Sequence, residues 1–218
     1  MIELLNVNKK FKENVIFSNL NVAFPSGKII MLKGPNGSGK SVLLRLIVGY
    51  SKPDSGTIKV DQTVIGKDTD FIPNAGVSID APEFISEFTG MENMEYLARI
   101  RKIASKQDIL SYAVKLGMEN EMYKKYKTYS LGMKQKLRLI QALMDKPQYL
   151  ILDEPFDALD DNGVNMVMKT LDEYCTEDTT LIITNHINEF DSFADDIYII
   201  ENKKLICKNP CQPSNYES

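Results

Sequence analysis

The chain has 218 residues, of which 43% are hydrophobic and 26% charged, and its net charge is -4, which is typical of one globular domain with a sizeable core. The slight negative charge argues against nucleic acid as a partner, and no stretch approaches the roughly 18 apolar residues of a membrane span. The three cysteines fit no C-x-x-C metal pattern and the N-terminus lacks the features of a signal peptide, so a reducing, cytosolic location is expected.

The first third of the chain predicts antiparallel strands and then a strand followed by a helix. Apolar and polar residues alternate over residues 2–9 and 14–24, which favours two antiparallel strands. The apolar residues 29–32 predict a buried strand, and residues 42–48 predict a helix. Between this strand and this helix lies a glycine-rich segment.

That segment, residues 34–41, carries the pattern G-x-x-x-x-G-K-[ST]. Glycines let backbone N–H groups close around phosphate oxygens, and the N-terminus of the following helix adds positive potential. Lys40 is expected to reach the β- and γ-phosphates of a nucleotide, and Ser41 to bind Mg²⁺. The predicted phosphate contacts are Gly34, Pro35, Asn36, Gly37, Ser38, Gly39, Lys40 and Ser41.

The middle of the chain changes to helical periodicity before strands and helices alternate again. Helices are predicted over residues 90–104, 130–144, 163–174 and 187–194. One more helix is predicted to follow a cap formed by residues 105–108. From residue 57 onward, strands are predicted over residues 57–60, 76–79, 149–152, 180–184 and 197–200. This alternation predicts an α/β fold whose mainly parallel core sheet is flanked by helices, with a helical insert at about 86–145.

Two acids, Asp153 and Glu154, stand at the end of the apolar strand 149–152. A strand buried on both faces should contain no carboxylate without a cause, and parallel sheets bind ligands at the carboxyl ends of their strands. We expect Asp153 to hold Mg²⁺ and Glu154 to face the γ-phosphate and activate the attacking water as a general base.

With these two motifs and residues 129–137, which read Y-S-L-G-M-K-Q-K-L, the chain resembles the ATP-binding subunit of an ATP-binding cassette (ABC) transporter. Ser130 and Gly132 match the family's L-S-G-G-Q signature, whereas Leu131 and Met133 depart from it. This variant form resembles the branch associated with export of peptide antibiotics and with immunity. The resemblance implies that Ser130 and Gly132, at a helix N-terminus, bind the γ-phosphate of an ATP held by a partner ATPase.

The resemblance also implies roles for further positions. Phe11 falls where the family stacks an aromatic ring on adenine, although a packing role at a strand end is the alternative. Asp160 belongs to a loop that crosses the dimer interface, and His186 matches the switch histidine that contacts the γ-phosphate and water. Glu154 and His186 are thus the expected catalytic residues.

One position departs from the family pattern in a way that bears on coupling. The family usually has a Gln between the phosphate loop and the helical insert, where it binds Mg²⁺ and senses the membrane partner. Here Asp80 appears in its place, and a carboxylate is also a good Mg²⁺ ligand. The alternative is a turn acid before Pro82.

The resemblance implies a single ABC ATPase domain of the P-loop NTPase fold. The nucleotide-binding core, with a small N-terminal antiparallel β-subdomain, would comprise residues 1–85 and 146–210, the helical insert 86–145, and a tail 211–218. ATP hydrolysis with Mg²⁺ would power a separate membrane-spanning permease through pairing with a second ATPase subunit, a copy or a paralogue. The chain would then be cytoplasmic and peripheral on the inner face of the cell membrane.

Three other functions remain open at this level. An ABC-type ATPase without transport, such as an iron–sulfur assembly ATPase, fits by length. A nucleotide-gated regulatory module would show little catalysis, which the presence of Glu154 and His186 argues against. A small-molecule or nucleoside kinase fits the phosphate loop but gives no reason for the Ser130 segment.

Overall fold

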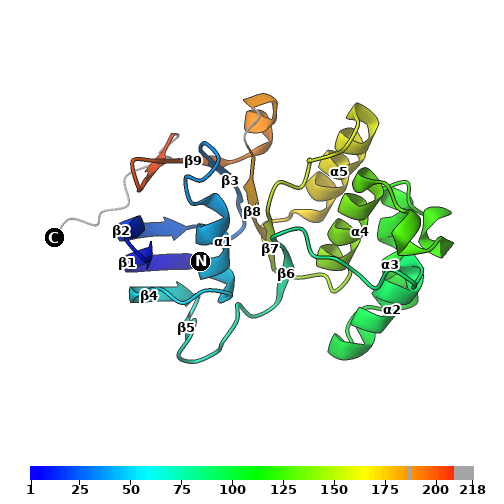
Figure 1. The fold of residues 1–218 in the computed structure, drawn as a ribbon, viewed down its shortest axis with the longest axis horizontal. Coiled ribbons are helices and arrows are strands. Elements are labelled where there is room, and N and C mark those ends of the chain that lie inside the picture. The colour runs from blue at the N-terminus through cyan, green and yellow to red at the C-terminus, as the bar shows by residue number, and fades with distance from the viewer. Residues whose placement is uncertain (186–187, 209–218) are drawn as a thin grey trace. The chain divides into compact units, whose positions relative to one another are not determined.

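The computed structural model describes residues 1–185 and 188–208, which form two compact units (Figure 1). The first unit comprises Met1–Ile72 and Ile182–Ser218, and the second comprises Pro73–Leu181. The expected tail at 211–218 lies outside the described residues, and the boundaries 86–145 of the helical insert stay a prediction. None of the helices in the described ranges combines the length and apolar character needed to cross a membrane.

The first unit contains a four-stranded antiparallel sheet. Its strand order is β2 (Asn14–Phe24), β1 (Ile2–Phe11), β4 (Ser55–Val60) and β5 (Thr63–Val64). The strands lie side by side in Figure 1, and β1 pairs antiparallel with both β2 and β4. Ile2, Leu4 and Val7 on β1 are fully buried, so one face of the sheet is apolar. The predicted antiparallel strands at 2–9 and 14–24 are confirmed.

The phosphate-loop strand and helix belong to the same unit. Strand β3 (Ile29–Lys33) pairs in parallel with β9 (Asp196–Glu201), which pairs antiparallel with β10 (Lys204–Cys207). Residues 182–184 of β8 (Thr180–Thr184) lie on the other side of β3. Three successive residues of β3 are fully buried, which explains its unbroken apolar run. Helix α1 (Lys40–Val48) follows and ends at Gly49 in the left-handed conformation.

Some details of this unit differ from the sequence prediction. Neither β5 nor β10 is predicted from the sequence pattern. The predicted helix at 187–194 is a 3-10 helix, η3 (Asn188–Phe193), over the described residues. Asp and Ser side chains compete for backbone hydrogen bonds and favour caps and turns, which disfavours a regular α-helix over this segment.

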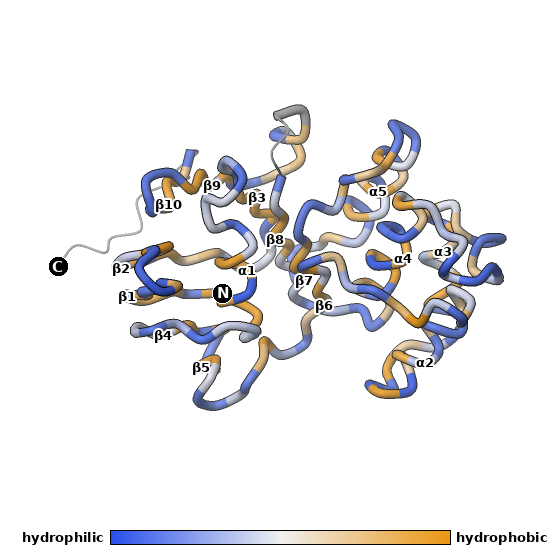
Figure 2. Tube along the Cα trace, in the orientation of Figure 1, coloured by the Kyte–Doolittle hydropathy of each residue, from blue (hydrophilic) through white to orange (hydrophobic). Residues whose placement is uncertain are grey.

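The second unit combines two parallel strands with four α-helices. Strand β6 (Ala75–Ser78) pairs in parallel with β7 (Tyr149–Leu152), whose hydrophobic residues are visible in orange in Figure 2. The helices are α2 (Gly90–Arg101), α3 (Lys106–Lys115), α4 (Leu131–Leu143) and α5 (Asp161–Tyr174), with 3-10 turns η1 (Glu121–Tyr123) and η2 (Tyr126–Thr128). Parallel pairing and flanking helices confirm the predicted α/β class. Ser105 caps α3 with Asp108 in a reciprocal capping box, as predicted.

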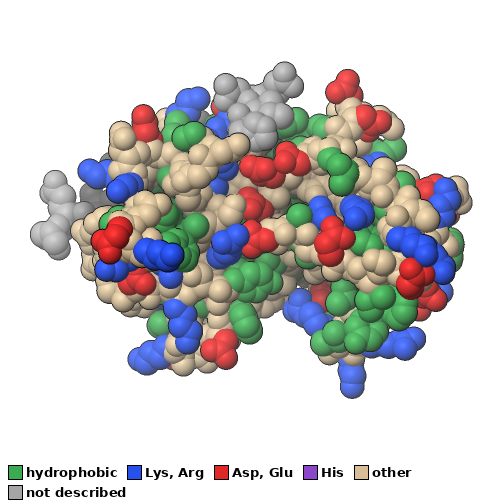
Figure 3. Space-filling view, in the orientation of Figure 1, with side chains coloured by type: hydrophobic (Ala, Val, Ile, Leu, Met, Phe, Trp, Pro, Cys, Tyr) green, Lys and Arg blue, Asp and Glu red, His purple; other side chains and the backbone are tan. Residues whose placement is uncertain are grey.

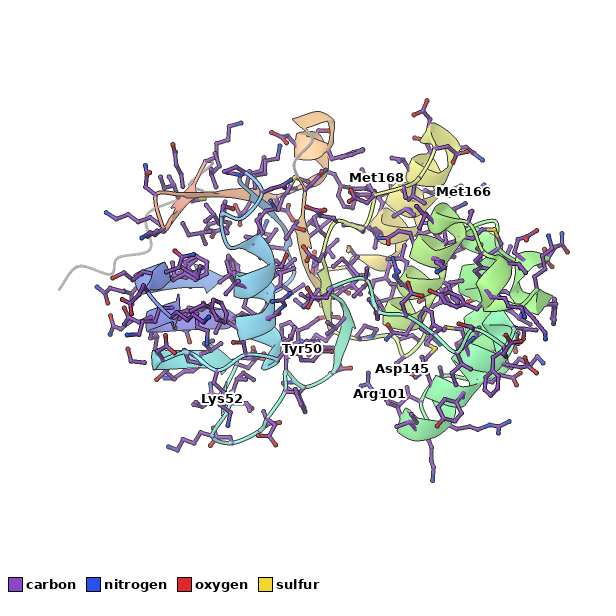
Figure 4. All side chains as sticks on the ribbon, viewed as in Figure 1. Tyr50, Lys52, Arg101, Asp145, Met166 and Met168 are labelled. Carbon is purple, nitrogen blue, oxygen red and sulfur yellow. The ribbon has the colours of Figure 1, made fainter. Side chains whose placement is uncertain are left out.

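An ion pair attaches the end of α2 to β6 and to the end of α4. The Arg101 guanidinium lies 3.2 Å from a carboxylate oxygen of Asp145 and donates to the Ala75 carbonyl at 3.1 Å (Figure 4). Asp145 is buried and also accepts a hydrogen bond from the Ala104 N–H at 3.2 Å. A buried carboxylate with two partners of this kind stabilises a defined orientation of α2 relative to β6 and β7.

Candidate functional site

The phosphate loop joins β3 to α1 in the conformation that its glycines allow. Gly34 has φ of +150°, and a Cβ there would lie 2.7 Å from the Ser38 hydroxyl and 2.8 Å from the Ile200 carbonyl oxygen. No other residue fits this position without displacing its neighbours. The loop closes on itself through a hydrogen bond of 3.1 Å from the Ser38 N–H to the Pro35 carbonyl.

Two polar groups in this loop are suited to an anionic ligand. Lys40, the first residue of α1, is only 6% exposed, and its ammonium donates to the carbonyls of Gly34 at 2.8 Å and Pro35 at 3.3 Å. The Ser38 hydroxyl is buried and has no hydrogen-bond partner within residues 1–185 and 188–208. A buried cation and an unsatisfied hydroxyl at a helix N-terminus fit phosphate oxygens. Ser41, the next residue of α1, is half-buried.

A cleft of about 320 Å³ borders the phosphate loop within the first unit. It is lined by Ile16 of β2, Ser38 of the loop and Lys203 of the β9–β10 turn, among others. Phe11, at the end of β1, is largely exposed, and the Lys9 ammonium lies 5.0 Å from its ring centroid. An exposed aromatic ring offers a face on which a ligand can stack, unlike a ring packed in the core.

The second unit places the predicted acids in one cleft of about 310 Å³. Asp153 and Glu154 follow β7, and Asp80 follows β6, so three predicted site residues line the same cleft, together with Asp157. The Asp153 N–H continues the strand pairing by donating to the Ser78 carbonyl at 2.8 Å. Among the described residues no group of three or more acidic, His or Cys side chains could hold a metal ion by itself, so these carboxylates can supply only part of the oxygen ligands that Mg²⁺ prefers.

Glu154 turns the chain sharply out of the strand. Its φ of +48° lies in the left-handed region, which costs a non-glycine residue about 1 to 3 kcal/mol. The Gln135 side chain on α4 donates to the Glu154 carbonyl at 3.1 Å and so supports this turn. Gln135 is a supporting residue that the sequence analysis missed, because 19 positions separate the two residues.

The segment after Asp80 is attached to α4 by a group of polar side chains. Glu83 accepts hydrogen bonds from Tyr126 at 2.9 Å, Lys134 at 3.2 Å and Arg138 at 3.1 Å. The Tyr126 hydrogen bond, with help from the two cations, lowers the pKa of Glu83. Arg138 also donates to the Pro82 carbonyl at 2.9 Å. These contacts fix the position of Pro82 and Glu83, the residues that follow Asp80, against α4.

The signature segment forms an open helix N-terminus. Ser130 is exposed, and its hydroxyl caps α4 by accepting a hydrogen bond of 3.2 Å from the Met133 N–H. Leu131 is 71% exposed. At Gly132 a Cβ would lie 2.9 Å from the Ala158 carbonyl oxygen, so the α4 start and the loop before α5 approach closely. Ser130 and Gly132 thus stand at a solvent-facing N-terminus with positive potential.

The remaining predicted residues are placed as follows. Asp160 caps α5, accepting a hydrogen bond of 2.8 Å from the Gly163 N–H, and is exposed. His186 lies outside the described residues. The phosphate loop and Phe11 therefore belong to the first unit, and Asp80, Ser130, Gly132, Asp153, Glu154 and Asp160 to the second.

Comparison with known proteins places this site in a family context. The sequence model of the family described as ABC transporter matches residues 17–157. The chain is 39% identical, over 87% of both proteins, to the ABC transporter ATP-binding protein YybJ of Bacillus subtilis (strain 168). It is 32% identical to the bacitracin transport ATP-binding protein BcrA of Enterococcus faecalis, over 94% of this chain and 68% of BcrA. It is 30% identical to the lantibiotic transport ATP-binding protein SrtF of Streptococcus pyogenes, over 94% and 89%.

Solved structures support the same fold. An ATP-binding subunit of an ABC transporter superposes with a TM-score of 0.87 at 19% identity, over 96% of this chain and 90% of that one. The dimeric structure of MJ0796, a bacterial ABC transporter cassette, gives a TM-score of 0.82 at 23% identity, over 94% and 96%. These superpositions confirm the predicted nucleotide-binding fold.

Proposed function

Because the chain belongs to the ABC transporter family, as an ATP-binding and ATP-hydrolysing subunit, we propose that the residues described above bind and hydrolyse ATP. The observation that carries this assignment is the position of Lys40 at the start of α1, where its buried ammonium donates a hydrogen bond to the Gly34 carbonyl of the loop. A cation held there, with the dipole of α1 behind it, is complementary to the charge of a triphosphate.

The cleft in the second unit supports the proposed hydrolytic roles. Glu154 acts as the general base for the attacking water, and Asp153 with Asp80 supplies carboxylates for Mg²⁺. Mg²⁺, when bound, neutralises charge on the transferred phosphoryl group. We assign Ser41 as a further Mg²⁺ ligand and His186 as a second group that orients the water. Phe11 stacks on adenine, which its exposed ring supports.

Replacing Asp80 by Ala is expected to lower the ATP turnover of the reconstituted transporter by about tenfold or more, because Asp80 is proposed to supply a carboxylate to Mg²⁺ and even residues that only support metal ligands have effects of about 10- to 100-fold. Asp80→Gln, which installs the residue usual in the family, is expected to retain most of the turnover. Asp178→Ala removes an exposed acid of the same unit and serves as the matched control. Phosphate release measures all three, and an unchanged rate for Asp80→Ala would remove this role.

We further propose that each ATP-binding site is completed by residues of a second ATPase subunit. The exposure of Ser130 and Leu131 at the N-terminus of α4 leaves this anion site open to a neighbouring subunit. The MJ0796 cassette, which shares the fold, has been solved as a dimer. Asp160, exposed at the start of α5, is assigned to the same interface.

Mixing two inactive variants tests this composite site. Lys40→Ala and Ser130→Glu subunits are each expected to be nearly inactive alone, because both sites of each dimer are damaged. In a mixed pair, one site combines the intact phosphate loop of the Ser130→Glu subunit with the intact Ser130 of its mate. Turnover is therefore expected to recover on mixing, to roughly a quarter of the parent rate by random pairing. Absence of recovery at any mixing ratio would contradict a site shared by two copies.

Exposed apolar side chains on α2 and directly after it support a docking site for the membrane-spanning permease. Ile100 is 69% exposed, Tyr96 and Ile103 are also largely exposed, and Figure 3 shows hydrophobic side chains gathered over α2. We propose that the permease docks here, so that the chain acts as a peripheral protein on the cytoplasmic face of the membrane. The names of BcrA and SrtF suggest peptide antibiotics as the transported class. No described residue of the site favours the iron–sulfur assembly alternative.

A further inference from the structure

The turn between β9 and β10 lies beside the phosphate loop. Strand β9 pairs in parallel with β3, so both strands end at the same edge of the sheet, where α/β folds bind their ligands (Figure 1). The two backbones approach closely there, because a Cβ at Gly34 would lie only 2.8 Å from the Ile200 carbonyl oxygen. The turn and the loop both belong to the first unit, so they are placed within one compact body.

The cleft that borders the phosphate loop also adjoins Phe11. It is lined by Asn14 and Ile16 of β2 and by Gly37 and Ser38 of the loop. Asn14 is the residue that pairs with Phe11 across the β1–β2 hairpin. With adenine stacked on Phe11 and the β- and γ-phosphates in the loop, the ribose and the α-phosphate that connect them would occupy this cleft.

Lys203, in the β9–β10 turn, is the one lysine or arginine among the described residues that line this cleft. Its side chain is exposed, and its ammonium has no ion-pair or hydrogen-bond partner within residues 1–185 and 188–208. Glu201 lines the cleft as well and would repel a phosphate, so a cation at this place offsets that repulsion. Lys203 is therefore available to an anionic ligand in the cleft.

The backbone of this turn suits glycine better than lysine. Glu201 and Lys204 pair across the hairpin, so Asn202 and Lys203 form a two-residue turn. Their φ values are +50° and +64°, and turns of this kind favour glycine at the second position. A residue with a Cβ is disfavoured in this conformation, so Lys203 places a cation beside the loop at a cost in stability.

We propose that Lys203 is a second nucleotide-binding cation of this protein and contacts the α-phosphate of ATP. Lys40 serves the β- and γ-phosphates, whereas Lys203 serves the phosphate next to the ribose. The inference rests on the proposed function, because it takes the places of adenine and of the terminal phosphates from Phe11 and the phosphate loop. Since ATP and ADP share the α-phosphate, Lys203 strengthens the binding of both and takes no part in bond cleavage.

Replacing Lys203 by Gly separates a binding role from a structural one. Glycine suits the left-handed turn, so the melting temperature is expected to stay the same or to rise. The affinities for ATP and ADP are both expected to fall about fivefold at low ionic strength, which is the upper range for an exposed charge contact. Lys203→Arg is expected to bind both nucleotides as the parent does. Thermal unfolding and fluorescent-nucleotide titration measure these quantities.

The ionic strength of the titration gives a further readout. At about 0.5 M salt, the difference in affinity between Lys203→Gly and the parent is expected to shrink to less than about twofold, because salt screens exposed charges. An altered turn without a lost charge contact would weaken binding equally at both ionic strengths. A salt-independent loss would therefore overturn the inference.

Lys204→Met is the matched control. Lys204 is the next residue in the chain and is also exposed, but it does not line the cleft. Its replacement removes the same charge from the same hairpin and is expected to change either affinity by less than about twofold. An equal loss in Lys204→Met would show a general effect of charge and would overturn the contact assigned to Lys203.

The remaining outcomes are equally decisive. Parent-like affinity of Lys203→Gly for both nucleotides, a lowered melting temperature, or a loss confined to ATP would each overturn the inference. If Lys203→Gly does not fold, Lys203→Gln is judged by its affinities and their salt dependence. Parent-like ATP binding by both Lys40→Ala and Lys203→Gly would refute the proposed function itself. Weakened binding in Lys40→Ala alone would refute only the role of Lys203.

Discussion

Glu154→Gln is expected to reduce ATP turnover by at least about 100-fold while ATP binding is retained, because an amide cannot accept the proton of the attacking water. Glutamine keeps the shape of the side chain at the left-handed position after β7, so the local turn is preserved. With hydrolysis blocked, the ATP-bound pair of subunits is expected to persist. Single-turnover phosphate release and light scattering in the presence of ATP measure the two effects.

Glu177→Gln is the control for this substitution. Glu177 is an exposed acid of the same unit, in the turn before β8. Its replacement by Gln therefore removes the same charge at a position outside the proposed site. Its turnover is expected to match that of the parent. Near-normal hydrolysis by Glu154→Gln, or a monomer of this variant in ATP, would contradict the proposed role.

Lys40→Ala is expected to weaken ATP binding about 10- to 100-fold, because a charge-assisted hydrogen bond to phosphate contributes about 1.5 to 3 kcal/mol. Turnover at saturating ATP is expected to fall at least about 100-fold as well, since the same cation neutralises charge that develops on the transferred phosphoryl group. Fluorescent-nucleotide titration and phosphate release measure the two losses.

Lys67→Ala removes an exposed lysine of the same unit and is expected to leave both quantities unchanged. Circular dichroism of both variants checks that α1 and its sheet remain folded. Parent-like ATP affinity in a folded Lys40→Ala variant would refute the assignment that carries the proposed function.

Much of this site could be predicted from the sequence because its determinants are local. The turn at Gly34 depends on the absence of a Cβ, and Lys40 is placed by its position six residues later at the start of α1. The cap of α4 by Ser130 depends on a hydrogen bond across only three residues. Steric limits and short-range hydrogen bonds of this kind are encoded within a few neighbouring positions.

Other elements could not be predicted because their partners are remote. Strand β10 is a short segment that becomes a strand by pairing with β9. The segment at 188–193 is a 3-10 helix whose Asp191 pairs with a residue of β3. Propensity over so few residues is weak, and contacts made elsewhere in the fold override it.

The amino-acid sequence by itself determined the groups on which the proposed chemistry rests: the glycine-rich loop with Lys40, the strand-end acids Asp153 and Glu154, and the capped helix at Ser130. Only the tertiary structure decided which groups support them. The Glu83 contacts to α4 and the Lys33–Asp191 ion pair join residues 55 and 158 positions apart. Such pairs have no local signature, because the fold alone brings together two charged residues that lie far apart in the sequence.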